Sequence, residues 1–310
     1  MQLRTTGPRL AAVAAAVAVC LLGTASSRGA DGPARTAPVA AAPAAPAEDT
    51  ACDTVSSLRP AKNANGAKIQ EIRQRGTLRV GVDQNSFNWG YRDPASGQIR
   101  GFDIDLARAI AASILGDAPK ISFIAVPTAK RIEAVKSGQV DMVVRTMTIT
   151  CERMKEVAFS KPYFRVSQSL VVPRSVPDMT VAEGVRGKRV CAADESGSER
   201  ELESGRYAPA EVKIVENQLD CLVLMQLGRI DATLADTTLA YAQQAQDPMV
   251  RVLDERIVPA FMGVAISQSA PDLVAWVNQV LAEYTAGDGW RNSYEAWLAP
   301  SMGTPEKYLP

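Results

Sequence analysis

The chain has 310 residues, of which 34 are basic, 34 are acidic and 46% are hydrophobic. This length suffices for two packed domains, and a net charge of zero gives no basic field for nucleic acid or an anionic membrane. The sequence contains no histidine. This absence excludes Ser-His and Cys-His nucleophilic dyads, histidine acid–base catalysis and the commonest metal ligand.

The N-terminus has the features of an export signal. Arg4 and Arg9 precede an apolar segment at 10–22, and small residues follow it. The apolar segment is shorter than the roughly 20 residues that a transmembrane helix needs. Residues 1–25 are therefore predicted to be a signal peptide.

Residues 26–50 are rich in Ala and Pro and have no hydrophobic period, which predicts a disordered tether. The tether suits a domain held away from a membrane, although secreted proteins also carry such segments. Cys20 lies within the apolar signal segment, in a poor lipoprotein cleavage motif. The exported protein is expected at the outer face of the cell membrane, either lipid-anchored through Cys20 or secreted.

The cysteine content agrees with export. Without Cys20, four cysteines remain, an even number for an oxidising compartment. Of the three possible pairings we favour Cys52 with Cys151 and Cys191 with Cys221. The second link closes a loop of about 30 residues, and the chain-entropy model predicts that it stabilises the folded state by roughly 3–4 kcal/mol. No metal or other cofactor is expected, because C-x-x-C spacing and histidine are both absent.

Strands and helices alternate after an N-terminal extension at 51–76, where Gly76 ends a short helix. The predicted elements are a strand at 78–82, an aromatic loop at 84–91, a helix from 101 to 116, a strand at 121–126, a helix at 129–136 and a strand from 140. Alternation of this kind predicts a mostly parallel sheet with helices on both faces. Ligands bind beyond the carboxyl ends of such strands, where Asp83, 128–131 and 146–150 fall.

The segment 139–153 combines a buried strand with a candidate anion site. Thr146, Thr148 and Thr150 alternate, so that their hydroxyls would line one side of an extended segment, and Arg153 follows them. A planar guanidinium matches a carboxylate through two parallel hydrogen bonds. The same pattern also occurs in ordinary strands, and the arginine could form a surface ion pair with its acidic neighbour.

After residue 162 the regular alternation of predicted strands and helices changes. Further strands are predicted at 169–172, 187–193, 212–215, 230–234 and 261–266, and helices at 219–227, 273–284 and 292–298. The loop 194–198 can present N–H groups to an anion, or Ser196 or Ser198 can simply cap the next helix. Asp236 opens another helix, either as its N-cap or as the acceptor of an ammonium group.

Seven motifs occur in order along the chain: G-T-L-R-V-G-V-D at 76–83, G-F-D-I-D-L-A-R-A-I-A at 101–111, S-G-Q-V-D at 137–141, T-I-T-C-E-R at 148–153, F-S-K-P-Y at 159–163, G-K-R-V at 187–190 and G-R-I-D-A at 228–232. Together, over about 76–298, they resemble the extracytoplasmic polar amino acid-binding proteins of ABC transporters, solute-binding protein family 3. The resemblance is closest to the glutamine- and glutamate-binding lipoproteins of high-GC Gram-positive bacteria, which also carry a Cys at the position of Cys151.

The resemblance implies an α/β fold of two lobes, each with a mostly parallel sheet flanked by helices, joined by two hinge strands. Lobe one would comprise 77–167 and 265–300, lobe two 173–260, and 301–310 would be a tail. The chain would cross between the lobes near 167–172 and 261–264.

The resemblance also implies roles for site residues. Arg153 would clamp the α-carboxylate of an amino acid, helped by Thr148 and by the loop at Ser196 and Gly197. Asp236 would accept the α-ammonium group. These are the same residues that the chemistry of the sequence singles out.

Selectivity for the ligand side chain would depend on three charged residues. Arg131 stands where similar glutamate- and aspartate-binding proteins direct an Arg at the side-chain carboxylate, and Arg145 is a second basic group. Asp83 favours glutamine instead, because an Asp there in glutamine binders accepts from the amide, and it would repel an acidic side chain unless an Arg neutralises it. Glutamate or aspartate is therefore favoured, with glutamine and asparagine next.

The remaining candidate ligand contacts are Thr146, at the end of the strand that begins at 140, and Phe87 and Trp89 in the aromatic loop. All three are expected among the ligand-binding residues.

The resemblance implies a monomeric binding protein that closes its hinge on a free polar amino acid and delivers it to an ABC permease. One alternative is a sensor domain that signals to a transmembrane partner. Another is an enzyme on a similar fold, a dehydratase or lytic transglycosylase. The absence of histidine and the presence of groups for both ends of a zwitterion argue against an enzyme, so no catalytic residue is expected.

Overall fold

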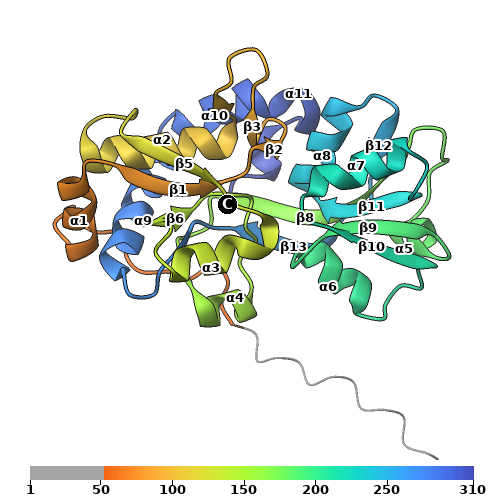
Figure 1. The fold of residues 1–310 in the computed structure, drawn as a ribbon, viewed down its shortest axis with the longest axis horizontal. Helices are drawn as coiled ribbons and strands as arrows, with labels where there is room; N and C mark the ends of the chain where they lie inside the picture. The colour runs from red at the N-terminus through yellow and green to blue at the C-terminus, as the bar shows by residue number, and fades with distance from the viewer. Residues whose placement is uncertain (1–51) are drawn as a thin grey trace, which may run out of the picture. The chain divides into compact units, whose positions relative to one another are not determined.

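Two sheets organise residues 52–310, the part of the chain that the computed structural model describes (Figure 1). The expected signal peptide, the tether and Cys20 lie outside these residues. Among the described helices, none is both long and apolar enough to cross a bilayer.

The first sheet has the strand order β5-β1-β6-β14-β7. The first lobe contains α1 (Ala67–Arg75), β1 (Leu78–Val82), β2 (Asn85–Ser86), β3 (Gly90–Arg92), β4 (Ile99–Arg100), α2 (Phe102–Leu115), β5 (Ile121–Ala125), α3 (Arg131–Lys136), β6 (Met142–Val143), α4 (Cys151–Glu156), β7 (Ala158–Phe159), β14 (Ala265–Ile266), α9 (Pro271–Ala286) and α10 (Gly289–Trp297). Strand β1 pairs in parallel with β5 and β6, whereas β14 runs antiparallel to β6 and β7. A short C-terminal helix, α11 (Ala299–Met302), contacts α8 of the second lobe.

The second sheet has the order β10-β9-β11-β8-β12. The second lobe contains α5 (Val181–Val185), β9 (Arg189–Ala193), α6 (Gly197–Glu203), β10 (Glu211–Val215), α7 (Gln218–Gln226), β11 (Ala232–Asp236), α8 (Thr237–Gln246) and β12 (Val250–Val252). Strand β9 pairs in parallel with β10 and β11, and the long strand β8 (Phe164–Pro173) is antiparallel to β11 and β12.

Two strands cross between the lobes. The N-terminal half of β8 pairs antiparallel with β13 (Ile257–Met262), from Phe164 opposite Met262 to Gln168 opposite Ile257. In Figure 1, β8 runs from the first lobe into the second. The predicted fold class, two α/β lobes joined by two strands, is confirmed. Each sheet has a parallel core of three strands, to which antiparallel strands are added.

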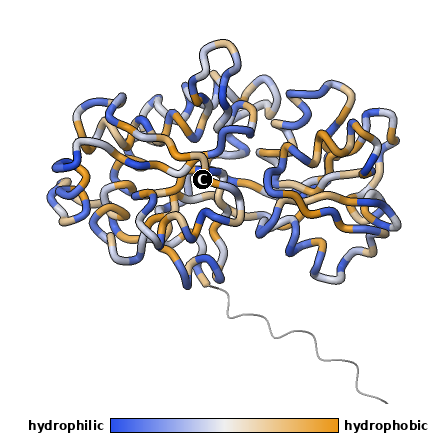
Figure 2. Tube along the Cα trace, in the orientation of Figure 1, coloured by the Kyte–Doolittle hydropathy of each residue, from blue (hydrophilic) through white to orange (hydrophobic). Residues whose placement is uncertain are grey.

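Apolar side chains fill both lobes, and Figure 2 shows hydrophobic residues concentrated along the central strands. The expected aromatic loop instead forms the hairpin of β2 and β3. Trp89 in this hairpin is 1% exposed, with its ring centroid 5.3 Å from that of Phe102 and 4.8 Å from that of Phe164. The prediction of Trp89 as a ligand contact is wrong, because the turn of the hairpin directs this large apolar ring into the core.

Both favoured cysteine pairs form disulfides. Cys52 joins Cys151 with a Cα–Cα distance of 5.6 Å, and Cys191 joins Cys221 at 5.7 Å. The second pair ties β9 to α7 and is fully buried. The first pair spans 99 residues, for which the chain-entropy model gives a stabilisation of about 4–5 kcal/mol.

Candidate functional site

A small polar cavity lies between the two lobes. It is bounded by residues that follow the ends of β6, β9 and β11, as expected for ligand sites in α/β sheets. Its lining consists of Thr128, Arg131, Arg145, Thr146, Thr148, Arg153, Ala193, Ser196, Gly197, Ser198, Gln218, Asp236 and Leu239.

Arg153 reaches into the cavity from α4. The helix begins there because the Thr150 side chain accepts a hydrogen bond from the Arg153 backbone N–H at 3.3 Å. The guanidinium donates to Thr148 O at 2.8 Å and, across the lobes, to Glu195 O at 2.9 Å. Burial lowers its pKa to about 10, so the group remains cationic at neutral pH. Three of its five N–H donors are left for an anion.

Asp236 faces Arg153 from the other lobe. It occupies the N-cap position of α8, yet its side chain makes no capping hydrogen bond. Instead its Oδ2 accepts from Thr148 Oγ1 at 3.1 Å, a second bond between the lobes. Burial raises the pKa of this carboxyl, and the bond from Thr148 opposes the shift. A carboxylate in this position is stabilised by a cation in the cavity.

The start of α6 forms another wall. Ser196 caps this helix, its hydroxyl accepting from Glu199 N at 3.0 Å, so the capping alternative applies to Ser196. Gly197 follows, and a Cβ at this position would lie 2.9 Å from Gln168 Nε2. A larger residue here would therefore displace the end of the Gln168 side chain, which belongs to the crossing strand β8.

The backbone at Thr146 is strained. Its φ of 42° lies in the left-handed region, which a β-branched residue rarely adopts. Its N–H donates to Asp103 Oδ2 at 2.8 Å, and Tyr163 Oη donates to the same carboxyl at 3.0 Å. Such strain persists where surrounding contacts hold it, typically at functional sites. The three threonines are therefore not on one regular extended edge: Thr146 and Thr148 line the cavity, whereas Thr150 caps α4.

Arg145 is neutralised within its own lobe. It is 2% exposed, and its guanidinium lies 3.1 Å from Asp83 Oδ2 and 3.1 Å from Thr128 Oγ1. Asp83 also accepts from the backbone N–H groups of residues 84 and 85 and from Ser86 Oγ. The two carboxylate oxygens of Asp83 thus accept from four donors, including Arg145, which leaves little capacity for a further hydrogen bond. It is also not among the residues that line the cavity.

Arg131 has no such counter-ion. It is 5% exposed, and its one hydrogen bond to residues 52–310 runs from Nε to Thr128 O at 2.7 Å. No carboxylate of the described chain lies within 4.0 Å of it. Desolvation, together with the nearby charges of Arg153 and Arg145, lowers its pKa well below the usual range. A buried cation in this environment is stabilised by an anionic partner.

The structure thus brings eight of the eleven predicted ligand contacts to one cavity: Arg131, Arg145, Thr146, Thr148, Arg153, Ser196, Gly197 and Asp236. It does not bring Asp83, Phe87 or Trp89 to the cavity surface. Phe87 packs against Tyr91, with ring centroids 4.9 Å apart, and lines a separate groove.

One polar residue of the cavity is missed by the sequence reasoning. Gln218, the first residue of α7, is buried and donates from Nε2 to Thr233 Oγ1 at 2.7 Å. It belongs to no motif. It follows a predicted strand, however, so the rule that ligands gather beyond strand ends could have indicated it.

We expect the Asp103 carboxyl to make stability depend on pH. Burial raises its pKa from 3.8 to about 7. Between these values the folded state binds more protons than the unfolded state, so stability falls as pH rises from about 4 to 7 and is then constant. The contribution is on the order of 4 kcal/mol. Thermal unfolding from pH 4 to 8 should show a smaller decline for Asp103→Asn than for wild type; equal slopes would contradict this assignment.

Comparison with known proteins gives consistent matches. The family model described as bacterial extracellular solute-binding proteins, family 3, matches residues 78–300. A glutamine-binding protein of Geobacillus stearothermophilus is 37% identical over 189 residues, 60% of this chain and 71% of that protein. The ABC transporter glutamine-binding protein GlnH of Bacillus subtilis is 29% identical over 245 residues, 76% of this chain and 89% of that protein.

Solved structures extend the match to the fold. The ancestral amino acid-binding protein AncCDT-1, a precursor of cyclohexadienyl dehydratase, is 31% identical, covers 74% of this chain and 99% of its own, and gives a TM-score of 0.67. The relatives described here are therefore binding proteins, one of them the precursor of an enzyme. With its two lobes, its interlobe cavity and a family match over 78–300, the chain belongs to family 3 of the bacterial extracellular solute-binding proteins.

Proposed function

We propose that the protein captures a polar L-amino acid between its lobes, with glutamate or aspartate preferred and glutamine or asparagine next, and delivers it to an ABC permease. The observation that carries this proposal is the placement of Arg153 and Asp236 in one cavity, on opposite lobes and joined through Thr148. The proposed site is outside the cell, on a monomer that is lipid-anchored or secreted.

The two charged groups suit the two ends of an amino acid. Arg153 supplies a rigid fork of donors for the α-carboxylate, and Asp236 supplies an acceptor for the α-ammonium group. Because the two side chains belong to different lobes, an amino acid that contacts both adds to the direct interlobe bonds from Thr148 and Arg153. Ligand binding would therefore favour the closed arrangement of the lobes.

The preference for an acidic side chain rests on Arg131. The cavity lining carries three guanidinium groups and one carboxylate, and Asp83 balances the Arg145 charge. A zwitterion with a neutral side chain leaves the Arg131 cation without a partner, whereas glutamate or aspartate supplies one. The names of the glutamine-binding relatives support amide ligands as the second choice.

Replacing Arg131 tests this preference directly. In Arg131→Gln, we expect glutamate affinity to fall about 100-fold, the loss typical of removing one partner from a buried charge pair. Glutamine affinity should change less than about fivefold. Isothermal titration calorimetry with both ligands measures the two effects. The exposed Arg92→Gln is the matched control and should leave both affinities unchanged; equal losses for the two ligands in Arg131→Gln would contradict the assigned role.

Delivery to a permease has its own test. A permease and an ATPase encoded beside this chain, and uptake of the bound amino acid that depends on all three, would support transport. Binding without uptake would contradict transport and favour the sensor.

A further inference from the structure

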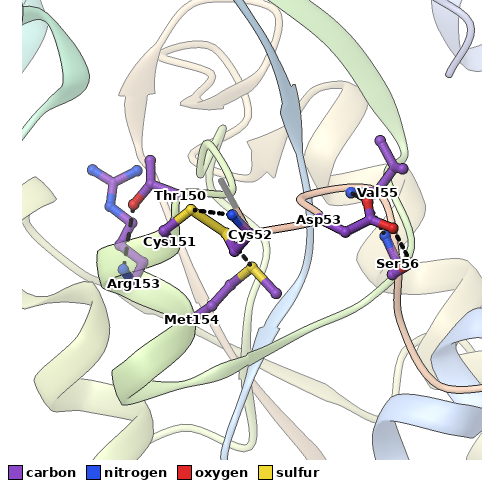
Figure 3. The surroundings of a disulfide bond; sticks show 8 residues. All are labelled: Cys52, Asp53, Val55, Ser56, Thr150, Cys151, Arg153 and Met154. Carbon is purple, nitrogen blue, oxygen red and sulfur yellow. Dashed lines mark hydrogen bonds between the residues drawn. A yellow bond between two sulfur atoms is a disulfide. The ribbon is translucent and has the colours of Figure 1, made fainter. Parts of the chain in front are cut away.

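The disulfide between Cys52 and Cys151 lies next to the residue that we assign to the α-carboxylate (Figure 3). Cys151 is the first residue of α4, and Arg153 is the third. The helix has six residues, too few to be stable through its own hydrogen bonds. The orientation of Arg153 therefore depends on what holds α4 against the first lobe.

A short segment at the start of the described chain provides part of that support. We call residues 52–58 the strap. At its first residue, Cys52 N donates to Cys151 Sγ at 3.3 Å, and Cys52 Sγ lies 3.7 Å from the sulfur of Met154 in α4. Figure 3 shows these contacts on the same turn of helix as Arg153. The disulfide and the Met154 contact both restrain that turn.

The other end of the strap is fixed to the body of the lobe. Ser57 Oγ donates to Phe159 O at 2.7 Å and accepts from Asn278 Nδ2 at 2.9 Å. The same Asn278 amide donates to Leu58 O at 2.7 Å. The disulfide thus connects α4 to β7 and α9 through a segment that is anchored at both ends.

We propose that the Cys52–Cys151 disulfide positions Arg153 for the ligand, and that its reduction by a dithiol weakens ligand binding while both lobes stay folded. This inference rests on the proposed binding of an amino acid at Arg153. In the reaction the S–S bond breaks and both sulfurs become thiols. The dithiol supplies the two electrons and two protons and closes to its own disulfide.

The two disulfides differ in their access to a reductant. Cys52 and Cys151 are both partly exposed, whereas Cys191 and Cys221 are 0% exposed. Thiol–disulfide exchange requires the attacking thiolate to reach a sulfur atom. A dithiol added to the folded protein should therefore open the first bond and leave the second intact.

The experiment treats the folded protein with dithiothreitol, alkylates the released thiols and locates them by mass spectrometry. We expect labels on Cys52 and Cys151, faster hydrogen exchange in residues 151–157 and glutamate affinity that is about tenfold weaker, because the ordering of Arg153 must then accompany binding. The double variant Cys52→Ser, Cys151→Ser should reproduce both effects without alkylation.

A variant at the far end of the strap tests the anchor separately from the disulfide. Ser57→Ala loses two hydrogen bonds but keeps the disulfide at α4 and the bond from Asn278 to Leu58 O, so it should weaken glutamate binding less than the double variant does. Unchanged exchange in 151–157 after reduction would overturn the proposal, as would wild-type affinity in the double variant. If the oxidised wild type bound no amino acid, the proposed function would fail, and hydrogen exchange would still decide whether the disulfide orders α4.

Discussion

Arg153→Ala should abolish binding of every amino acid ligand while the protein remains folded. The wild-type guanidinium is 5% exposed, and two of its N–H groups are held by the carbonyls of Thr148 and Glu195. Truncation removes the donors for the α-carboxylate and also one of the direct bonds between the lobes. Removing one partner of a buried charge pair costs about 4 kcal/mol, which corresponds to a dissociation constant about 1,000-fold larger.

Arg153→Lys is the informative companion variant. Lysine keeps the positive charge but loses the planar fork, so it cannot hold both carbonyls and a carboxylate in the same way. We expect an affinity between those of wild type and the alanine variant. Calorimetry measures the affinities and circular dichroism verifies the fold. Wild-type affinity in Arg153→Ala would contradict the assignment of the carboxylate site.

Asp236→Asn should reduce affinity about 100-fold or more and at the same time raise the melting temperature. Asparagine can still accept from Thr148 Oγ1 but cannot pair with an ammonium group. Burial raises the pKa of Asp236, which means that its charge destabilises the folded protein when no cation is bound. Loss of binding with a gain in stability is expected of a residue kept for function.

The exposed Asp220 of α7 provides the control for this variant. Asp220→Asn changes the net charge of the lobe by the same amount, so it should leave both affinity and melting temperature near the wild-type values. Calorimetry and thermal unfolding distinguish the two variants. If Asp236→Asn bound glutamate as tightly as wild type, the ammonium would have to be recognised elsewhere.

The fold was predictable because local patterns determine it. Strands and helices alternate from β1 to β6, which predicts a parallel sheet, and β1 buries Leu78, Val80 and Val82 on one face. Polar residues just beyond those strands, at 128–131 and 146–150, could then be assigned to one edge of the first sheet. Only the resemblance to the family placed Asp236, on the other sheet, in the same site as Arg153. The sequence of motifs along the chain resembles the family to which it belongs.

Other features required tertiary structure. Arg131 is on a helix and has the sequence context of a surface charge, yet it is 5% exposed and lines the cavity between the lobes. The pairing of Arg145 with Asp83 joins residues 62 positions apart and changes which of them faces the ligand. Trp89 has a ring that suits either a ligand wall or a core, and only the hairpin geometry decides between them.

The central claim is that the cavity between the lobes binds a polar L-amino acid with an acidic side chain preferred. Calorimetric titration of the purified protein with L-glutamate, L-aspartate, L-glutamine and L-asparagine, after a thermal-shift screen of all twenty amino acids, tests it most directly. We predict one-to-one binding with dissociation constants in the micromolar range, about −8 kcal/mol, and tighter binding of the two acids than of their amides. No binding of any of the twenty amino acids would contradict it.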